Sequence, residues 1–164
     1  MTNSVNPIPD GYTTVTPFLV VDGGAQAIDF YRDAFGATLV DRTDGPDGSV
    51  AHAELDFGNG RVQLSDPHPT MGLHAPDGTT DVNHSYVLYC ADVDATFTRA
   101  IALGARAFEE PSTFVTGDRF ASLLDPFGHR WAIMTRVEDV SPADAKRRLD
   151  EWVATQNARA VSEY

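Results

Sequence analysis

The chain has 164 residues, which is enough for one domain and too short for two ordinary ones. A domain of this length buries enough surface to fold without cross-links, and the single cysteine, Cys90, excludes a disulfide framework or a cysteine-rich metal site. The formal net charge of −12 argues against nucleic acid and anionic membrane surfaces as partners, because both repel a polyanion. No apolar run approaches the length of a membrane span, and residues 1–12 lack the pattern of a signal peptide, so we expect a cytoplasmic protein.

The first half of the chain predicts a strand, a helix and three further strands. Residues 14–21 are β-branched and apolar, with Pro17 favouring an edge position or a strand start. Apolar residues then recur at helical spacing until Gly36. The expected elements are a strand at 14–21, a helix at 25–35, and strands at 37–41, 50–57 and 61–65.

The second half repeats this order after a long loop at 66–83, which is rich in proline, glycine and histidine. The segment Ala34–Ala37 recurs as Ala102–Ala105, and an offset of 69 residues sets Gln63 against Ala132. Two βαβββ modules, at 13–67 and 84–137, are the simplest interpretation. The expected elements are a strand at 85–91, a helix at 93–103, and strands at 106–109 (ended by Pro111), 119–124 and 130–135.

A last helix is predicted at 141–158, opened by a Ser141 cap and Pro142 at the first helical position. Its apolar stripe holds Leu149, Trp152 and Val153. This helix belongs to neither repeat, so we expect its stripe to bury against the body or against a second subunit.

The tandem arrangement resembles the vicinal oxygen chelate superfamily (glyoxalase, bleomycin resistance protein and extradiol dioxygenase), and its PhnB-like branch in particular. Seven segments carry the resemblance in the order of the family: 14–21, 27–37, 48–55, 92–95, 117–119, 125–129 and 137–142. The resemblance implies an α+β fold in which residues 1–164 form a single domain. Two four-stranded halves would build a curved eight-stranded sheet around a ligand cleft. It also implies a homodimer, in which two chains often complete each cleft.

The resemblance places the metal ligands of metal-dependent members at four positions, one on the first and one on the last strand of each module. Those positions fall at Thr16, Gln63, Ser85 and Ala132. Ala132 has no donor atom, and the two hydroxyls are poor ligands for a divalent ion, so we expect no metal and no cofactor. If the strand register were shifted by one residue, His84 would take the place of Ser85 and become a candidate ligand.

Polar residues alternate with apolar ones along 50–57, and they form the candidate catalytic site. His52, Glu54 and Asp56 share one face of the predicted strand, opposite Ala53 and Leu55. If the apolar face packs under the helices, His52 and Glu54 point into the cleft and can act as an acid–base pair. The alternative is a solvated outer strand face.

Four further residues are candidate ligand-binding side chains: Gln63, Arg119, Trp131 and Tyr86. Arg119 suits a carboxylate or phosphate, or else a structural ion pair with Asp118 or Asp125. The two aromatic residues suit a flat ligand if they line the cleft, and core packing if they do not. The histidines of the long loop, His68, His74 and His84, have no spacing typical of a metal site.

Three functions remain open at this point. The first is a metal-free protein of the bleomycin-resistance type that binds a small molecule, such as a drug or a toxic metabolite. The second is a metal-dependent lyase, isomerase or dioxygenase of the same superfamily. The third is a metal-free enzyme that uses His52 and Glu54, because the fold alone does not select among these chemistries.

Overall fold

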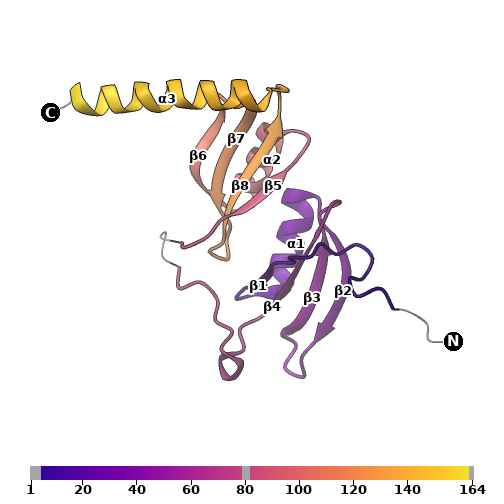
Figure 1. Ribbon diagram of the computed structural model, residues 1–164. Helices are drawn as coiled ribbons and strands as arrows, with labels where there is room; N and C mark the ends of the chain where they lie inside the picture. The colour runs from indigo at the N-terminus through magenta and orange to yellow at the C-terminus, as the bar shows by residue number, and fades with distance from the viewer. Residues whose placement is uncertain (1–4, 79–81, 163–164) are drawn as a thin grey trace.

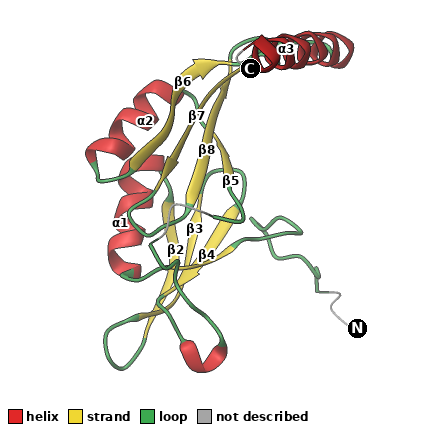
Figure 2. Cartoon of the chain, turned by 90° about the vertical axis from the view of Figure 1, so that its left-hand side faces the viewer, coloured by secondary structure: helices red, strands yellow, loops and turns green. Residues whose placement is uncertain are grey.

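Two βαβββ modules follow one another along the chain, as predicted, in a computed structural model that describes residues 5–78 and 82–162 (Figure 1). Each module forms its own four-stranded sheet. The one long helix within each module lies on the same side of both sheets (Figure 2). The elements are β1 (Phe18–Val20), α1 (Gly24–Phe35), β2 (Thr38–Asp44), β3 (Val50–Asp56), β4 (Arg61–Ser65), the short 3-10 helix η1 (Pro69–Met71), β5 (Tyr86–Tyr89), α2 (Val93–Ala102), β6 (Arg106–Thr113), β7 (Asp118–Leu124), β8 (Arg130–Arg136) and α3 (Pro142–Ser162).

The two sheets have the same strand order, β1-β4-β3-β2 and β5-β8-β7-β6. In each sheet the first strand runs parallel to the last strand of its module, and the other neighbours are antiparallel. Phe18 lies opposite Gln63, and Val87 lies opposite Ala132, so the predicted offset of 69 residues holds in the strand register.

The helix ends are equivalent too. Gly36 follows α1 with a φ of 76°, and Gly104 follows α2 with a φ of 101°. Glycine adopts this left-handed conformation without the clash that a Cβ atom would cause. Each helix is therefore followed by a left-handed glycine, directly after α1 and one residue later after α2, where Leu103 is the cap. The shared device agrees with the internal repeat.

One aromatic cluster joins the modules beneath the helices. The Trp131 ring of β8 lies 5.5 Å from the Tyr31 ring and 5.0 Å from the Phe35 ring, both on α1. Phe57, which follows β3, stacks on Trp131 at 5.8 Å. Because Trp131 is 2% exposed and Tyr31 is fully buried, this contact removes large apolar surfaces of both modules from water.

A buried carboxylate fixes the same junction. Asp125, which is 3% exposed, accepts hydrogen bonds from the Tyr31 hydroxyl (2.7 Å) and from Trp131 Nε1 (2.8 Å). Its other oxygen accepts from the backbone N–H groups of Phe127 and His129, each at 2.9 Å. Burial and the neighbouring carboxylate raise the pKa of Tyr31. The hydroxyl therefore stays protonated and donates a hydrogen bond to Asp125.

Several elements differ from their expected bounds. The strand expected at 37–41 extends to Asp44, and the one expected at 85–91 is shorter, at Tyr86–Tyr89. The first strand begins at Phe18 and not at residue 14, because Pro17 has no N–H group for the ladder and offers only its carbonyl, to the N–H of Gln63. The strand expected to end before Pro111 continues to Thr113, since β6 is an edge strand and its register shifts around the proline. Helix α3 extends to Ser162.

We predict that Tyr31→Phe destabilises the protein by about 1–3 kcal/mol, because Asp125 loses a buried donor. Urea unfolding measures the effect, and Tyr89→Phe is the control, since Tyr89 is 60% exposed. Equal loss in the two variants would contradict the role given to Asp125.

Candidate functional site

The face of the first sheet that lies away from the helices is polar. Gln63 on β4 lies between Phe18 on β1 and Glu54 on β3, and opposed residues of a ladder share a face. His52 lies two residues before Glu54 and so points to the same side. We call Phe18, His52, Glu54 and Gln63 the polar face, after the last three of these residues. The intervening residues Ala53 and Leu55 are fully buried in the core, as the alternation predicts.

Glu54 is the most connected residue of the polar face. Its carboxylate lies 3.5 Å from His52 Nε2 and 3.1 Å from Arg61 Nη1, and it accepts a hydrogen bond from Gln63 Nε2 at 3.3 Å. A hydrogen bond from Tyr12, with smaller contributions from His52, Gln63 and Arg61, lowers the pKa of Glu54. Glu54 is therefore ionised at neutral pH and can orient the His52 ring.

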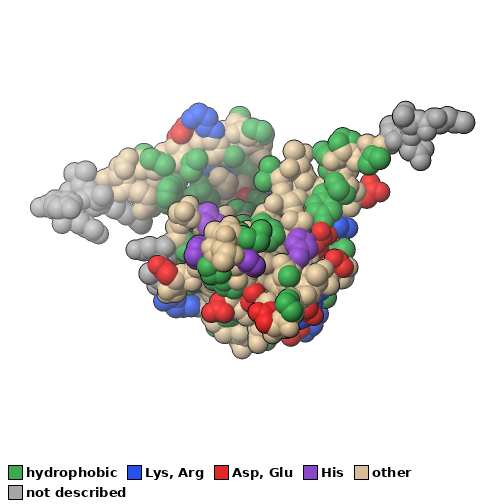
Figure 3. All heavy atoms as spheres, turned by 90° about the horizontal axis from the view of Figure 1, so that it is seen from below, with side chains coloured by type: hydrophobic (Ala, Val, Ile, Leu, Met, Phe, Trp, Pro, Cys, Tyr) green, Lys and Arg blue, Asp and Glu red, His purple; other side chains and the backbone are tan. Residues whose placement is uncertain are grey.

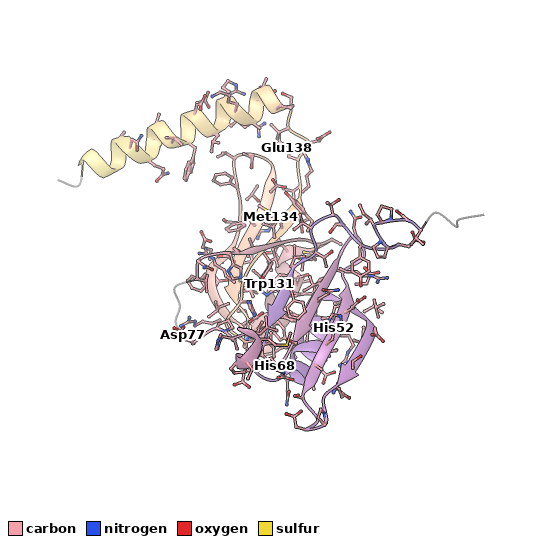
Figure 4. The ribbon with its side chains drawn as sticks, turned by 60° about the horizontal axis from the view of Figure 1, so that its bottom comes forward. His52, His68, Asp77, Trp131, Met134 and Glu138 are labelled. Atoms are coloured by element: carbon pink, nitrogen blue, oxygen red, sulfur yellow. The ribbon has the colours of Figure 1, made fainter. Side chains whose placement is uncertain are left out.

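His52 also lines a cavity that measures about 770 Å³. Its walls come from β1, the turn between β2 and β3, the start of β3, the end of β4 and the loop that follows β4. Figure 4 shows His52 on the sheet and His68 on that loop nearby. Most of the remaining wall is apolar, including Phe18, Met71 and Leu73. The cavity can hold a small molecule, with His52 as a polar contact at one side.

On the corresponding face of the second sheet, the β5–β8 side is apolar, whereas β7 and β6 carry Ser122 and Glu109. Val87 and Tyr89 on β5 are 61% and 60% exposed, and their ladder partners on β8 are Ala132 and Met134. We call these four residues the apolar face. Val87 and Ala132 correspond to Phe18 and Gln63 at an offset of 69 residues. Ser122, the ladder partner of Ala132, takes the place of Glu54, so a hydroxyl replaces the carboxylate there.

The other predicted ligand-binding residues lie elsewhere. Trp131 is a core residue of the module junction, although its edge reaches a cavity of about 430 Å³ that Tyr86 also lines. Arg119 forms a bidentate ion pair with Asp94 of α2, at 2.5 and 2.6 Å, and not with Asp118 or Asp125. Of the four candidates, only Gln63 lies beside His52 and Glu54.

Sequence reasoning missed two neighbours of Glu54. Arg61 reaches it from β4, and its guanidinium carbon lies 4.6 Å from the centre of the Tyr12 ring. The position of Arg61 opposite Asp56 in the hairpin could have indicated its face. No local pattern predicts that Tyr12, which precedes the first strand, folds back over it.

Comparisons with known proteins agree with this architecture. The family model described as "Glyoxalase/Bleomycin resistance protein/Dioxygenase superfamily" matches residues 12–133. The chain belongs to this superfamily. An uncharacterized protein of Mycobacterium bovis, Mb0911c, is 38% identical over 130 residues, which cover 77% of this chain and 86% of that protein.

Solved structures show the same fold. TioX from Micromonospora sp. ML1 superposes with a TM-score of 0.58 at 23% identity, over 79% of this chain and all of TioX. A PhnB protein from Bacillus cereus superposes with a TM-score of 0.58 at 17% identity, over 75% of this chain and 99% of its own. At these identities the likeness describes the fold and not the activity.

The four superfamily ligand positions carry poor donors here. Thr16 and Ser85, which the resemblance assigned to the first strands, lie before β1 and β5, and the ladder partners of Gln63 and Ala132 are Phe18 and Val87. The Ala132 side chain is only a methyl group. Thr16 donates its hydroxyl to the carbonyl of Thr13. Over the described ranges 5–78 and 82–162, no group of three or more His, Cys, Asp or Glu side chains is arranged to hold a metal ion. Within the same ranges, no helix is long and apolar enough to cross a membrane.

We predict that protein purified without a histidine tag and dialysed after exposure to zinc, nickel, iron or manganese retains well under one ion per chain. Three or four good donors are needed to hold such an ion against water, and the superfamily positions supply only Gln63. Elemental analysis makes the measurement, and stoichiometric retention of any of these metals would contradict the prediction.

Proposed function

We propose that this protein is a metal-free, small-molecule binding protein of the PhnB-like branch, and that its ligand occupies the cavity beside the polar face. The observation that carries the proposal is the contact between His52 and the ionised Glu54 at the wall of a largely apolar cavity of about 770 Å³. The cavity supplies shape and apolar surface, while His52 supplies a hydrogen bond whose direction Glu54 fixes.

The charge of the chain narrows the class of ligand. A protein with a net charge of −12 repels anions at long range and attracts cations. Glu54 and Asp47 place further carboxylates on or near this cavity. We therefore expect a cationic or neutral ligand, such as a drug of the bleomycin type or a toxic metabolite.

Binding without chemistry is favoured by the state of Glu54. Its carboxylate is ionised and is engaged by Arg61, Gln63 and His52, so it has no proton to donate as a general acid. A metal-free enzyme would have to use His52 as its acid, with the ionised Glu54 as a base or as the group that orients the His52 ring. A metal-dependent lyase, isomerase or dioxygenase would need donors that Thr16, Ser85 and Ala132 lack.

A homodimer is the second part of the proposal. Helix α3 projects away from the sheets (Figures 1 and 2). Its contacts with its own body include the Trp152–Phe114 ring pair at 5.3 Å and the bidentate Arg148–Glu138 ion pair. Leu149, Trp152 and Val153 remain 38–43% exposed. An isolated helix is marginally stable in water, so a second copy that covers this stripe and the apolar face would stabilise it.

Calorimetry with bleomycin as the first cationic probe, followed by neutral and anionic aromatic compounds, tests the binding site. His52→Ala should weaken binding of a compound that binds the wild type by about tenfold, because a hydrogen bond of ~1–3 kcal/mol is lost. Glu54→Gln should also weaken binding, whereas Asp33→Asn removes the same charge from the exposed side of α1 and should not.

Two results would contradict the binding site. One is equal affinity of the wild type and His52→Ala for every compound that binds. The other is recovery of a bound compound as a chemically different product, which would make the protein an enzyme.

Light scattering tests the dimer. We expect about twice the chain mass of 17.8 kDa at micromolar concentration. Trp152→Asp should shift the protein towards the monomer, whereas Ala154→Asp adds the same charge to the opposite side of α3 and should leave the dimer intact. A wild-type mass of one chain would contradict the proposal.

A further inference from the structure

All five histidines of the chain line one of two cavities on either side of Phe18. His52 and His68 line the cavity described above. The other three line a second cavity of about 550 Å³. Figure 3 shows histidine side chains gathered on this underside of the molecule. The second cavity belongs to both modules, since Phe18 and Val20 come from β1 and Tyr86 comes from β5. Its histidines are His74, His84 and His129.

His129 carries an acceptor without a partner into this wall. The side chain is 5% exposed, and its Nε2 lies 3.1 Å from the carbonyl oxygen of Val20. A carbonyl oxygen only accepts, so Nε2 holds the proton and Nδ1 is left with a lone pair. Nδ1 is buried and has no hydrogen-bond partner among the residues that the structure describes. Burial also lowers the pKa of His129, which keeps the ring neutral at physiological pH.

The neighbouring polar groups already satisfy one another. His84 Nδ1 lies 2.6 Å from Asn83 Oδ1 and donates to it, so His84 Nε2 accepts from the Tyr86 hydroxyl at 3.1 Å. None of these contacts involves His129 Nδ1. The site therefore offers a ligand the unpaired, neutral acceptor of His129, and leaving that acceptor unpaired is unfavourable. Asp77 and His74 line the same cavity, and Asp77 is already engaged in an interaction.

The rings around this acceptor suit a flat molecule. The His84 and Tyr86 rings lie 6.2 and 6.0 Å from the His129 ring, and Phe18 and Pro76 add apolar wall. Nδ1 is buried, so a ligand that binds it must displace a neighbouring side chain, and the exposed His84 is the nearest ring that is free to move. An anion is disfavoured, because the chain is strongly acidic and the free group is an acceptor.

We propose that this cavity is a second ligand site, which takes a neutral or cationic small molecule with a planar apolar body and an O–H or N–H group that donates to His129 Nδ1. A metal ion is the less favoured occupant, because the described His, Cys, Asp and Glu side chains form no group of three arranged to hold one. The proposal does not depend on binding at His52, since the two cavities share Phe18 but no histidine.

Phenol and anisole are the probes, because they share a ring and only phenol can donate a hydrogen bond. In full-length protein labelled with ¹⁵N-histidine, phenol at millimolar concentration should shift the His129 Nδ1 resonance. Phenol should also bind about fivefold more tightly than anisole. His129→Leu should abolish this preference, and His68→Leu, in the other cavity, should retain it.

The wild-type resonance keeps the test independent of how well His129→Leu folds. Three results would overturn the proposal: no shift of His129 with phenol, equal affinity for the two probes, or zinc binding that shifts His74, His84 and His129 together. Loss of bleomycin binding in His52→Ala with phenol binding unchanged would separate the two sites, and joint loss of both in His52→Ala would overturn their independence.

Discussion

A single buried carboxylate, Asp125, holds the two modules in one arrangement. Removing a carboxylate from water is costly unless hydrogen bonds replace its hydration. Here the replacement comes from both halves of the chain, through the Tyr31 hydroxyl of the first module and Trp131 Nε1 and two backbone N–H groups of the second. The aromatic cluster around Trp131 packs in the same place, so polar and apolar contacts at the junction support one geometry.

Both candidate sites depend on this junction, though to different degrees. The second cavity needs it directly, because the His129 backbone donates to Asp125 while the His129 ring donates to Val20 of the first module. The polar face is built within one module and depends on a different carboxylate. Asp66 accepts from the N–H groups of Gly23, Gly24 and Val50, so it joins the start of α1 to the start of β3, where His52 lies.

The sequence predicts the repeat and the faces of its strands well, because both depend on periodicities that span many residues. The alternation at 50–57 correctly separates His52 and Glu54 from the buried Ala53 and Leu55. The offset of 69 residues between Gln63 and Ala132 correctly relates the β1–β4 register to the β5–β8 register. These features follow from local spacing, which a single sequence contains.

Contacts between distant segments are what the sequence does not predict. Arg119 pairs with Asp94, 25 residues away, and no short-range pattern distinguishes that partner from Asp118 or Asp125. Tyr12 reaches Glu54 and Arg61 because the segment before β1 folds back over the sheet. From the sequence alone, Trp131 could belong to the core or contact a ligand. Only the packing of α1 against β8 shows that it is a core residue.

The central claim is that this member of the superfamily binds an organic molecule without a metal and as a pair of chains. Native mass spectrometry of untagged protein tests these parts in one measurement. The account predicts a species of two chains that carries a small organic adduct and no d-block metal, and loss of that adduct in His52→Ala. A single chain that carries one zinc, nickel, iron or manganese ion would contradict it.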